Sequence, residues 1–189
     1  MVELLLHFTV PFAAFSSLGM NWRKVLFVSI AALAPDLDIL FHVHRSLSHS
    51  VLVLAVIVIP ILALTRKNPT VTRLTLLGAA GVLTHLALDL FGSYTPLLWP
   101  IVNQSIWIST KLDVHMGSFP IFIMSARLLT KLIGFAAFQS IDAPIVTTEG
   151  LGISLVLFIP SLVGMFRATA RRRHTSTQGH APTNPMPNV

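Results

Sequence analysis

Long apolar segments separated by short polar ones make up most of the chain. The apolar segments cover residues 4–20, 25–34, 51–65, 70–92, 119–138 and 151–166. A helix of about 20 apolar residues spans the roughly 30 Å hydrocarbon core of a bilayer, and prolines or glycines at segment boundaries stop helices. The pattern therefore predicts an all-α fold, an integral membrane helical bundle of about 4–5 membrane-embedded helices. The first two segments are shorter than a full span, so they fit either a short spanning pair or a partly embedded helical hairpin.

Two segments in the second half of the chain need a separate interpretation. Residues 93–118 mix prolines, tryptophans and polar residues, which is typical of an interfacial loop. Residues 119–138 are apolar but carry Arg127 and Lys131, which their four-residue spacing would place on one face of a helix. We expect that helix to lie in the membrane interface or to cover a site.

The composition supports a membrane location. Of the 189 residues, 53% are hydrophobic and 11% are charged, whereas charged residues make up about a quarter of a typical soluble protein. The length suits one domain, which we assign to residues 1–173, and residues 174–189 lack apolar periodicity and are expected to form a disordered tail. Because the chain has no cysteine, histidine, aspartate and glutamate are its only strong metal ligands.

The net charge of +6 comes from basic residues that flank the apolar segments. They form three groups: Arg23 with Lys24, Arg66 with Lys67 and Arg73, and Arg167 with Arg171, Arg172 and Arg173. The positive-inside rule places such groups on the cytoplasmic side of the inner membrane. The groups are not interleaved with aromatic residues, as a nucleic-acid surface would be, so we expect the lipid bilayer as partner and no nucleic acid.

One polar stretch, residues 35–50 (PDLDILFHVHRSLSHS), stands out among the apolar segments. It contains two of the five aspartates and three of the eight histidines of the chain: Asp36, Asp38, His42, His44 and His49. If the basic groups face the cytoplasm, this stretch lies on the extracytoplasmic face together with His7, His85 and Asp89. Ionisable residues at membrane depth are costly and usually functional, so their convergence predicts a single site on that face.

The residue types in this set indicate metal chemistry. His85 and Asp89 are four residues apart, so a helix would present both to one metal ion. Histidine nitrogen and carboxylate oxygen without sulfur suit zinc, with manganese or ferrous iron as alternatives. Arg45 can clamp an anion through two N–H groups, although an interfacial arginine would also meet lipid headgroups. The chain contains no H-E-x-x-H, G-x-S-x-G or P-loop motif, which excludes those rival chemistries.

Taken in order, these motifs resemble those of a known family. They are His7, PDLD at residues 35–38, HRSLSHS at residues 44–50, HLALD at residues 85–89 and PLLWP at residues 96–100. They resemble the YdjM-type family of membrane-bound metal-dependent hydrolases, also described as LexA-binding inner-membrane proteins. That family is in turn remotely similar to zinc-dependent phospholipase C and single-strand nucleases. The resemblance implies zinc ligands at His7, His49, His85, Asp89 and one aspartate of PDLD, either Asp36 or Asp38, of which we assign Asp36.

We therefore expect a membrane-bound hydrolase that uses a metal-activated water to attack a phosphoester, with phospholipid as a candidate substrate. In this interpretation Asp38 orients or deprotonates the water, and Arg45 stabilises the charge that develops on the ester. Two other classes stay open. One is a metal-ion or proton-coupled transporter, which would need polar residues through the depth of the bundle. The other is a non-catalytic scaffold in which a metal joins the helices.

Overall fold

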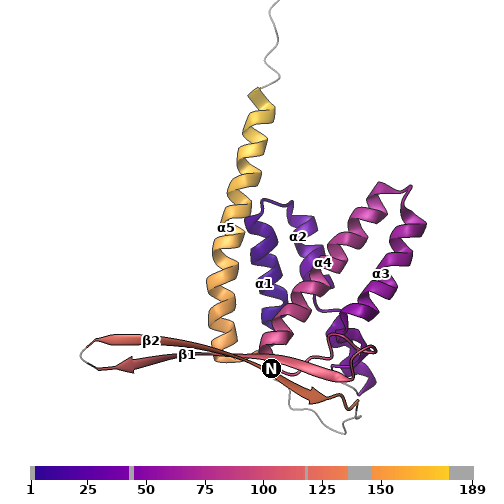
Figure 1. Ribbon diagram of the computed structural model, residues 1–189. Coiled ribbons are helices and arrows are strands. Elements are labelled where there is room, and N and C mark those ends of the chain that lie inside the picture. The colour runs from indigo at the N-terminus through magenta and orange to yellow at the C-terminus, as the bar shows by residue number, and fades with distance from the viewer. Residues whose placement is uncertain (1–2, 43–44, 118, 136–145, 179–189) are drawn as a thin grey trace, which may run out of the picture.

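The protein is described by a computed structural model that covers residues 3–42, 45–117, 119–135 and 146–178 (Figure 1). Its elements are α1 (Leu4–Ser17), α2 (Trp22–Ala31), the 3₁₀ helices η1 (Pro35–Phe41) and η2 (Leu47–His49), α3 (Val51–Thr65), α4 (Pro69–Gly92), the strands β1 (Gln104–Met116) and β2 (Pro120–Leu132), and α5 (Thr148–Gln178). The α-helices lie side by side, and the two strands form a hairpin that crosses beneath them and projects beyond the bundle (Figure 1).

Three of the helices begin at a polar side chain that caps the first turn. Asn21 accepts a hydrogen bond from the backbone N–H of Arg23 at 3.0 Å, at the start of α2. Ser50 caps α3 and Asn68 caps α4 in the same way, and Pro69 occupies the first turn of α4. Such acceptors satisfy N–H groups that have no partner within the helix. The polar residues between the apolar segments therefore decide where the helices start.

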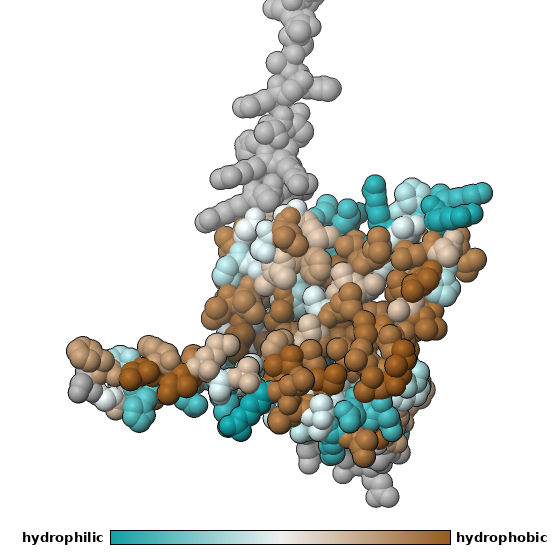
Figure 2. Space-filling view, viewed as in Figure 1, coloured by the Kyte–Doolittle hydropathy of each residue, from teal (hydrophilic) through white to brown (hydrophobic). Residues whose placement is uncertain are grey.

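The bundle is thin, and much of its apolar surface faces outward. α1 contacts α2 and α5, while α4 contacts α2 and α3. The buried apolar side chains are Phe12, Val25, Val28, Ala32 and Leu86. α3 has no buried residue, and a broad apolar belt covers the outer surface between two more hydrophilic ends (Figure 2). This distribution suits a bundle whose outer faces meet lipid.

The described residues contain two helices that are long and apolar enough to cross a membrane, α4 and the Thr148–Phe166 part of α5. α1 has 14 residues and α3 has 15, so each is about 21–23 Å long at about 1.5 Å per residue. The hydrocarbon core is roughly 30 Å thick, so neither helix spans it without local thinning of the bilayer. The prediction of 4–5 membrane-embedded helices is wrong in this respect.

The all-α prediction is also wrong, because 18% of the chain lies in strands beside 61% in helices. β1 and β2 pair in antiparallel register from Gln104↔Leu132 to Met116↔Pro120, where an interfacial loop and a helix were expected. β1 alternates apolar and polar residues with the period of two that a strand requires. The four-residue spacing of Arg127 and Lys131 places them on one face of a strand as well as of a helix, so it could not decide between the two.

α2 and α4 approach each other closely at Gly81. A Cβ atom at this position would lie 2.4 Å from the backbone oxygen of Val28, which is far inside a normal contact. We expect Gly81→Ala to lower the free energy of unfolding by about 1–3 kcal/mol, because the helices must separate. Thermal unfolding of the detergent-solubilised protein, followed by circular dichroism, measures this change.

Gly78→Ala, one turn earlier on α4, is the matched control. A Cβ atom at Gly78 would meet the Phe27 ring at 3.8 Å, an ordinary contact. Alanine favours a helix over glycine by about 0.8–1 kcal/mol, so this variant should be neutral or more stable. Equal destabilisation by both substitutions would contradict the close approach at Gly81.

Candidate metal centre

Four separate segments bring their polar side chains together at one end of the bundle. The contributors are His7 from α1, Asp36 and Asp38 from η1, Arg45 and His49 around η2, and His85 and Asp89 from α4. His7, His49, His85 and Asp89 are 1%, 0%, 0% and 2% exposed. The structure thus brings together every residue that the sequence assigned to the site.

The ring nitrogens and carboxylate oxygens of this cluster are spaced as ligands of one ion would be. His49 Nε2 lies 3.2 Å from His85 Nε2 and 3.2 Å from Asp89 Oδ2. His85 Nε2 lies 3.4 Å from Asp89 Oδ2 and 3.5 Å from Asp36 Oδ1, and His49 Nε2 lies 3.6 Å from Asp36 Oδ1. Two ligands of a tetrahedral zinc with bonds of about 2.0–2.1 Å are about 3.3–3.4 Å apart. Two sets of three ligand atoms therefore fit a zinc-sized ion: His49 and His85 with Asp89, and His49 and His85 with Asp36.

His7 extends the cluster on the α1 side. Its ring stacks on the ring of His85 with centroids 3.8 Å apart, and its Nε2 atom lies 3.5 Å from Asp89 Oδ1. Two groups of three side chains could hold a metal: His7, His85 and Asp89, and Asp36, His49 and His85. Because His85 belongs to both groups, the cluster offers ligands for one ion or for two adjacent ions.

A buried ligand atom gives a second test of whether a metal fits. Asp89 Oδ2, which faces His49 Nε2 and His85 Nε2, is buried and has no hydrogen-bond partner within the described part of the chain. Buried polar atoms are nearly always satisfied, and an orphaned one calls for an ion or water that completes the site. Three imidazoles and two carboxylates without sulfur suit zinc, manganese or ferrous iron.

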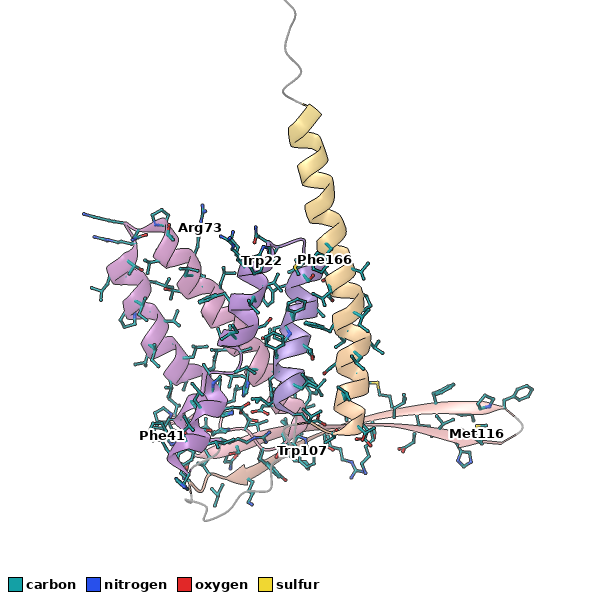
Figure 3. All side chains as sticks on the ribbon, turned by 180° about the vertical axis from the view of Figure 1, so that it is seen from behind. Trp22, Phe41, Arg73, Trp107, Met116 and Phe166 are labelled. Atoms are coloured by element: carbon teal, nitrogen blue, oxygen red, sulfur yellow. The ribbon has the colours of Figure 1, made fainter. Side chains whose placement is uncertain are left out.

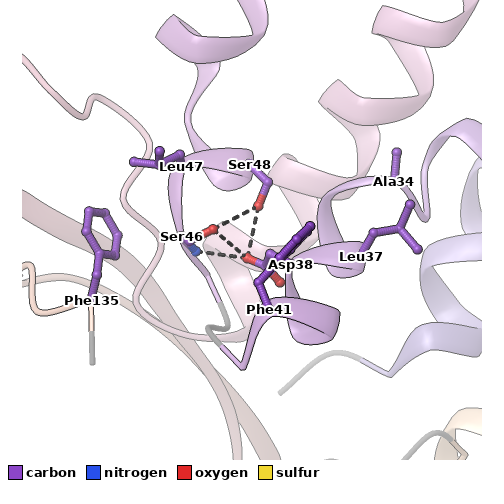
Figure 4. A pocket seen from close by; sticks show the side chains of 8 residues that line it. All are labelled: Ala34, Leu37, Asp38, Phe41, Ser46, Leu47, Ser48 and Phe135. Atoms are coloured by element: carbon purple, nitrogen blue, oxygen red, sulfur yellow. Dashed lines mark hydrogen bonds between the residues drawn. The ribbon is translucent and has the colours of Figure 1, made fainter. Parts of the chain in front are cut away.

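Asp38 lies on the opposite side of His49 from the shared ligand atoms. Its Oδ2 atom is 3.3 Å from His49 Nδ1 and accepts hydrogen bonds from the Ser46 backbone N–H, the Ser46 hydroxyl and the Ser48 hydroxyl at 2.9, 3.0 and 2.9 Å (Figure 4). A carboxylate on one nitrogen of a histidine fixes the ring and directs the other nitrogen toward a metal. The sequence did not assign these serines, although the S-x-S-H spacing places both beside His49.

Arg45 is directed at the cluster from outside. Its Nη2 group donates to Asp89 Oδ1 at 2.7 Å and its Nη1 group to the Tyr94 backbone oxygen at 3.3 Å. The backbone of Arg45 has a φ of 57°, a left-handed conformation that costs a non-glycine residue about 1–3 kcal/mol. The ion pair with Asp89 offsets that cost and holds the guanidinium beside the ligand atoms.

Other histidines and aspartates lie outside the cluster. Asp113 and His115 are exposed on β1, and His42 is exposed at the end of η1. His44 falls outside the described residues. Tertiary structure therefore separates Asp113 and His115 from the residues that form the site, although both are candidate ligands by residue type.

His49 is the basic group of the cluster. Burial by itself lowers the pKa of His49, but hydrogen bonds to Asp36, Asp38 and Asp89 outweigh it and raise the pKa to about 10. Burial by itself raises the pKa of Asp36, but the hydrogen bond to His49 and the nearby His85 and His7 leave the pKa below its usual value. At neutral pH the cluster therefore balances imidazolium against carboxylate, and a metal ion must displace the His49 proton.

Fold and site together define a class: a helical membrane protein with a buried histidine and aspartate cluster, able to hold a metal, at one end of its bundle. The chain belongs to the YdjM inner membrane protein family, whose sequence model matches residues 4–173. The family resemblance and the membrane location expected from the sequence are confirmed. The family's description names no reaction. Neither the curated proteins nor the solved structures contain a match to this chain.

Metal content is the direct test of the cluster. Purified protein should contain stoichiometric zinc, manganese or iron by plasma mass spectrometry, and the double variant His85→Ala, Asp89→Ala should lose it, because both proposed groups of ligands include His85. The double variant Asp113→Ala, His115→Ala makes the same changes on the exposed β1 strand and should keep the metal. Equal metal content in both variants would contradict a site in the cluster.

Zinc binding should also release protons. With a pKa of about 10, His49 is protonated at pH 7 and must lose its proton to bind through Nε2. Each displaced proton raises the apparent affinity about tenfold per pH unit until pH approaches 10. Calorimetric titrations in two buffers of different ionisation enthalpy measure the release, and equal heats in both buffers would contradict it. Asp38→Asn keeps the ligands but removes one cause of the raised pKa, so it should release fewer protons.

The same shift predicts a pH dependence of stability for protein stripped of metal by a chelator. The folded-state pKa of His49 lies above its ordinary value of 6.5, so its ion pairs stabilise the fold fully below pH 6.5. This contribution is lost as the pH rises through about 10. Unfolding temperatures measured across this range should fall for the native sequence and less for Asp38→Asn.

Proposed function

We propose that this protein is a membrane-bound metal-dependent hydrolase of phosphoesters and that its substrate is a phospholipid. The observation that carries the proposal is the 3.2–3.6 Å spacing of the His49, His85, Asp36 and Asp89 ligand atoms. An arginine beside the same ligands adds the positive charge that phosphoester hydrolysis needs.

The ligands of the proposed metal are five buried or nearly buried side chains: His7, Asp36, His49, His85 and Asp89. Zinc is the first choice for this set, with manganese or ferrous iron as alternatives. When bound, such an ion lowers the pKa of a water molecule to about 7 and polarises a phosphoryl oxygen.

The chain's own residues supply the remaining functions. Asp38 positions His49, since its Oδ2 atom contacts His49 Nδ1 and is held by Ser46 and Ser48. This position favours a role for Asp38 in orienting the ligand over one as general base. The Arg45 guanidinium lies next to Asp89, where it stabilises negative charge that develops on the ester oxygens.

A cavity of about 570 Å³ lies beside Asp38, on the far side of His49 from the ligand atoms, and its mainly apolar lining supports a lipid substrate whose acyl chain it would hold. Its lining residues are Ala34, Leu37, Asp38, Phe41, Ser46, Leu47, Ser48 and Phe135 (Figure 4). Leu37 and Phe41 are 58% and 80% exposed, so the cavity offers apolar walls at its mouth and polar groups near Asp38. An amphipathic lipid matches this combination better than a small soluble phosphate ester does.

The orientation in the membrane is also part of the proposal. Figure 3 places Arg73 at the opposite end of the helices from Phe41 and Trp107, which lie at the end of the bundle that contains the site. Arg66, Lys67 and Arg73 would lie in the cytoplasm by the positive-inside rule. The site would then be on the extracytoplasmic side, at the depth of the lipid headgroups.

The same substitution, aspartate to asparagine, at three different positions tests the proposed hydrolase activity. Asp89→Asn should abolish phospholipid hydrolysis by the metal-loaded protein in mixed micelles, because it removes a proposed ligand. Asp38→Asn should lower kcat/KM by about 10–100-fold, as loss of a residue that orients a metal ligand typically does. Asp113→Asn on the exposed β1 strand should have no effect. Release of phosphate or of a phosphorylated headgroup is the measurement.

Absence of turnover by metal-loaded wild-type protein on phospholipids and on soluble phosphoesters would overturn the proposal. Metal flux into liposomes in that case would indicate a transporter. Loss of stability on chelation, without turnover or flux, would indicate a metal that only joins the helices.

A further inference from the structure

The β1–β2 hairpin has no role in the proposed function. Each strand has 13 residues, so the hairpin is about 40 Å long at about 3.3 Å per residue. It crosses the end of the helical bundle that contains the site, and the end of β1 at Met116 lies well away from the helices (Figures 1 and 3). Most of its length therefore lacks support from the bundle in the described part of the chain.

The two faces of the hairpin differ in chemistry. The pairing register places Ile108 opposite Leu128, Leu112 opposite Met124, and Val114 opposite Phe122 on one face, which we call the apolar face. That face carries no charged residue. The other face, which we call the charged face, contains every charged residue of the two strands: Lys111, Asp113, Arg127 and Lys131.

The apolar face is uncovered. Leu112, Phe122, Met124 and Leu128 are 66%, 67%, 76% and 68% exposed. Contiguous apolar surface of this kind is unfavourable in water and marks an interaction site. The strongly hydrophilic side chains of the hairpin gather on the side turned away from the helices (Figure 2), which leaves the apolar face toward the level of the apolar belt.

The attachment of the hairpin sets its depth. β1 begins soon after α4 ends at Gly92, and the Trp107 indole N–H donates to the Phe91 backbone oxygen at 3.1 Å. Trp107 also packs edge-on against Tyr94, with ring centroids 5.4 Å apart. Tryptophan and tyrosine favour the boundary between hydrocarbon and headgroups. The base of the hairpin therefore lies where the candidate spanning helix α4 leaves the membrane.

A two-stranded sheet cannot lie deeper than this boundary. Among the described residues, the outer edge of each strand has backbone N–H and C=O groups without a strand partner, and hydrocarbon cannot satisfy them. Headgroups and water can satisfy them at the interface. The hairpin thus has the depth, the apolar face and the open edges of an interfacial element.

We propose that the hairpin lies flat on the membrane leaflet at the site end of the bundle, with its apolar face on the acyl chains. Its charged face then lies among the headgroups. Lys111, Arg127 and Lys131 outnumber Asp113 there, so the surface that it fits is one that contains anionic phospholipids. This inference does not depend on the proposed hydrolase.

Two adjacent positions at the same distance along the hairpin test the orientation. The chain has no cysteine, so Leu112→Cys and Asp113→Cys can each be labelled with the fluorophore nitrobenzoxadiazole in the full-length protein. In phosphatidylcholine and phosphatidylglycerol vesicles, the label at position 112 should emit at shorter wavelength and be quenched by acyl-chain nitroxides. The label at position 113 should be quenched by aqueous iodide.

Strong iodide quenching at both positions would place the hairpin in water and overturn the proposal. A disulfide-linked dimer of the unlabelled Leu112→Cys variant, formed in high yield on oxidation, would also overturn it, because a second copy would then cover the apolar face. Both positions are exposed, and circular dichroism checks that each variant folds.

A charge variant tests the preference for anionic lipid. In the Leu112→Cys background, addition of phosphatidylglycerol to phosphatidylcholine vesicles should increase nitroxide quenching. The triple variant Lys111→Gln, Arg127→Gln, Lys131→Gln should lose that increase. A control variant removes three positive charges at the opposite end of the bundle: Arg66→Gln, Lys67→Gln, Arg73→Gln. This variant should retain the increase in quenching. An increase that persists in the hairpin variant would overturn the headgroup preference.

Discussion

A buried carboxylate must be compensated, and Asp89 is the carboxylate on which this structure depends. Its side chain is 2% exposed and meets Arg45 at 2.7 Å. His7, His49 and His85 approach it within 3.5 Å. Removing one member of such a network leaves an uncompensated charge and costs about 3–5 kcal/mol. Because the partners come from α1, the η1–η2 region and α4, the same interactions that form the site also hold this end of the bundle together.

The surroundings of the cluster are organised around one histidine. Ser46 and Ser48 hold Asp38, and Asp38 faces His49 Nδ1, which leaves His49 Nε2 directed at the shared ligand atoms. The arrangement is rigid because η1 and η2 pack on each other and Ser50 caps the following helix. A short polar stretch between two apolar segments thus performs three tasks: it supplies ligands, fixes their orientation and starts α3.

The membrane explains why so small a core suffices. The buried apolar residues are concentrated where α1, α2 and α4 meet, and the remaining apolar surface forms the belt in Figure 2. In lipid this surface needs no protein cover, and close approach at small residues such as Gly81 replaces a broad hydrophobic core. The site end of the bundle then lies at the membrane–water interface, together with the hairpin and the ends of the shorter helices. Water, headgroups and hydrocarbon all meet the protein there.

The sequence by itself determined the membrane class and the family, and it predicted the histidines and aspartates that the structure brings together. Long apolar segments and flanking basic residues indicate a membrane protein. The ordered motifs from His7 to the PLLWP segment indicate the family. The spacing of His85 and Asp89 places both on one helical face whatever the rest of the chain does. Only the tertiary structure decided that Asp113 and His115 lie apart from the cluster, that Arg45 pairs with Asp89, and that residues 104–132 form a hairpin. The physical reason is that strand pairing and ion pairing join residues distant in sequence, whereas composition and helical periodicity record only local preference.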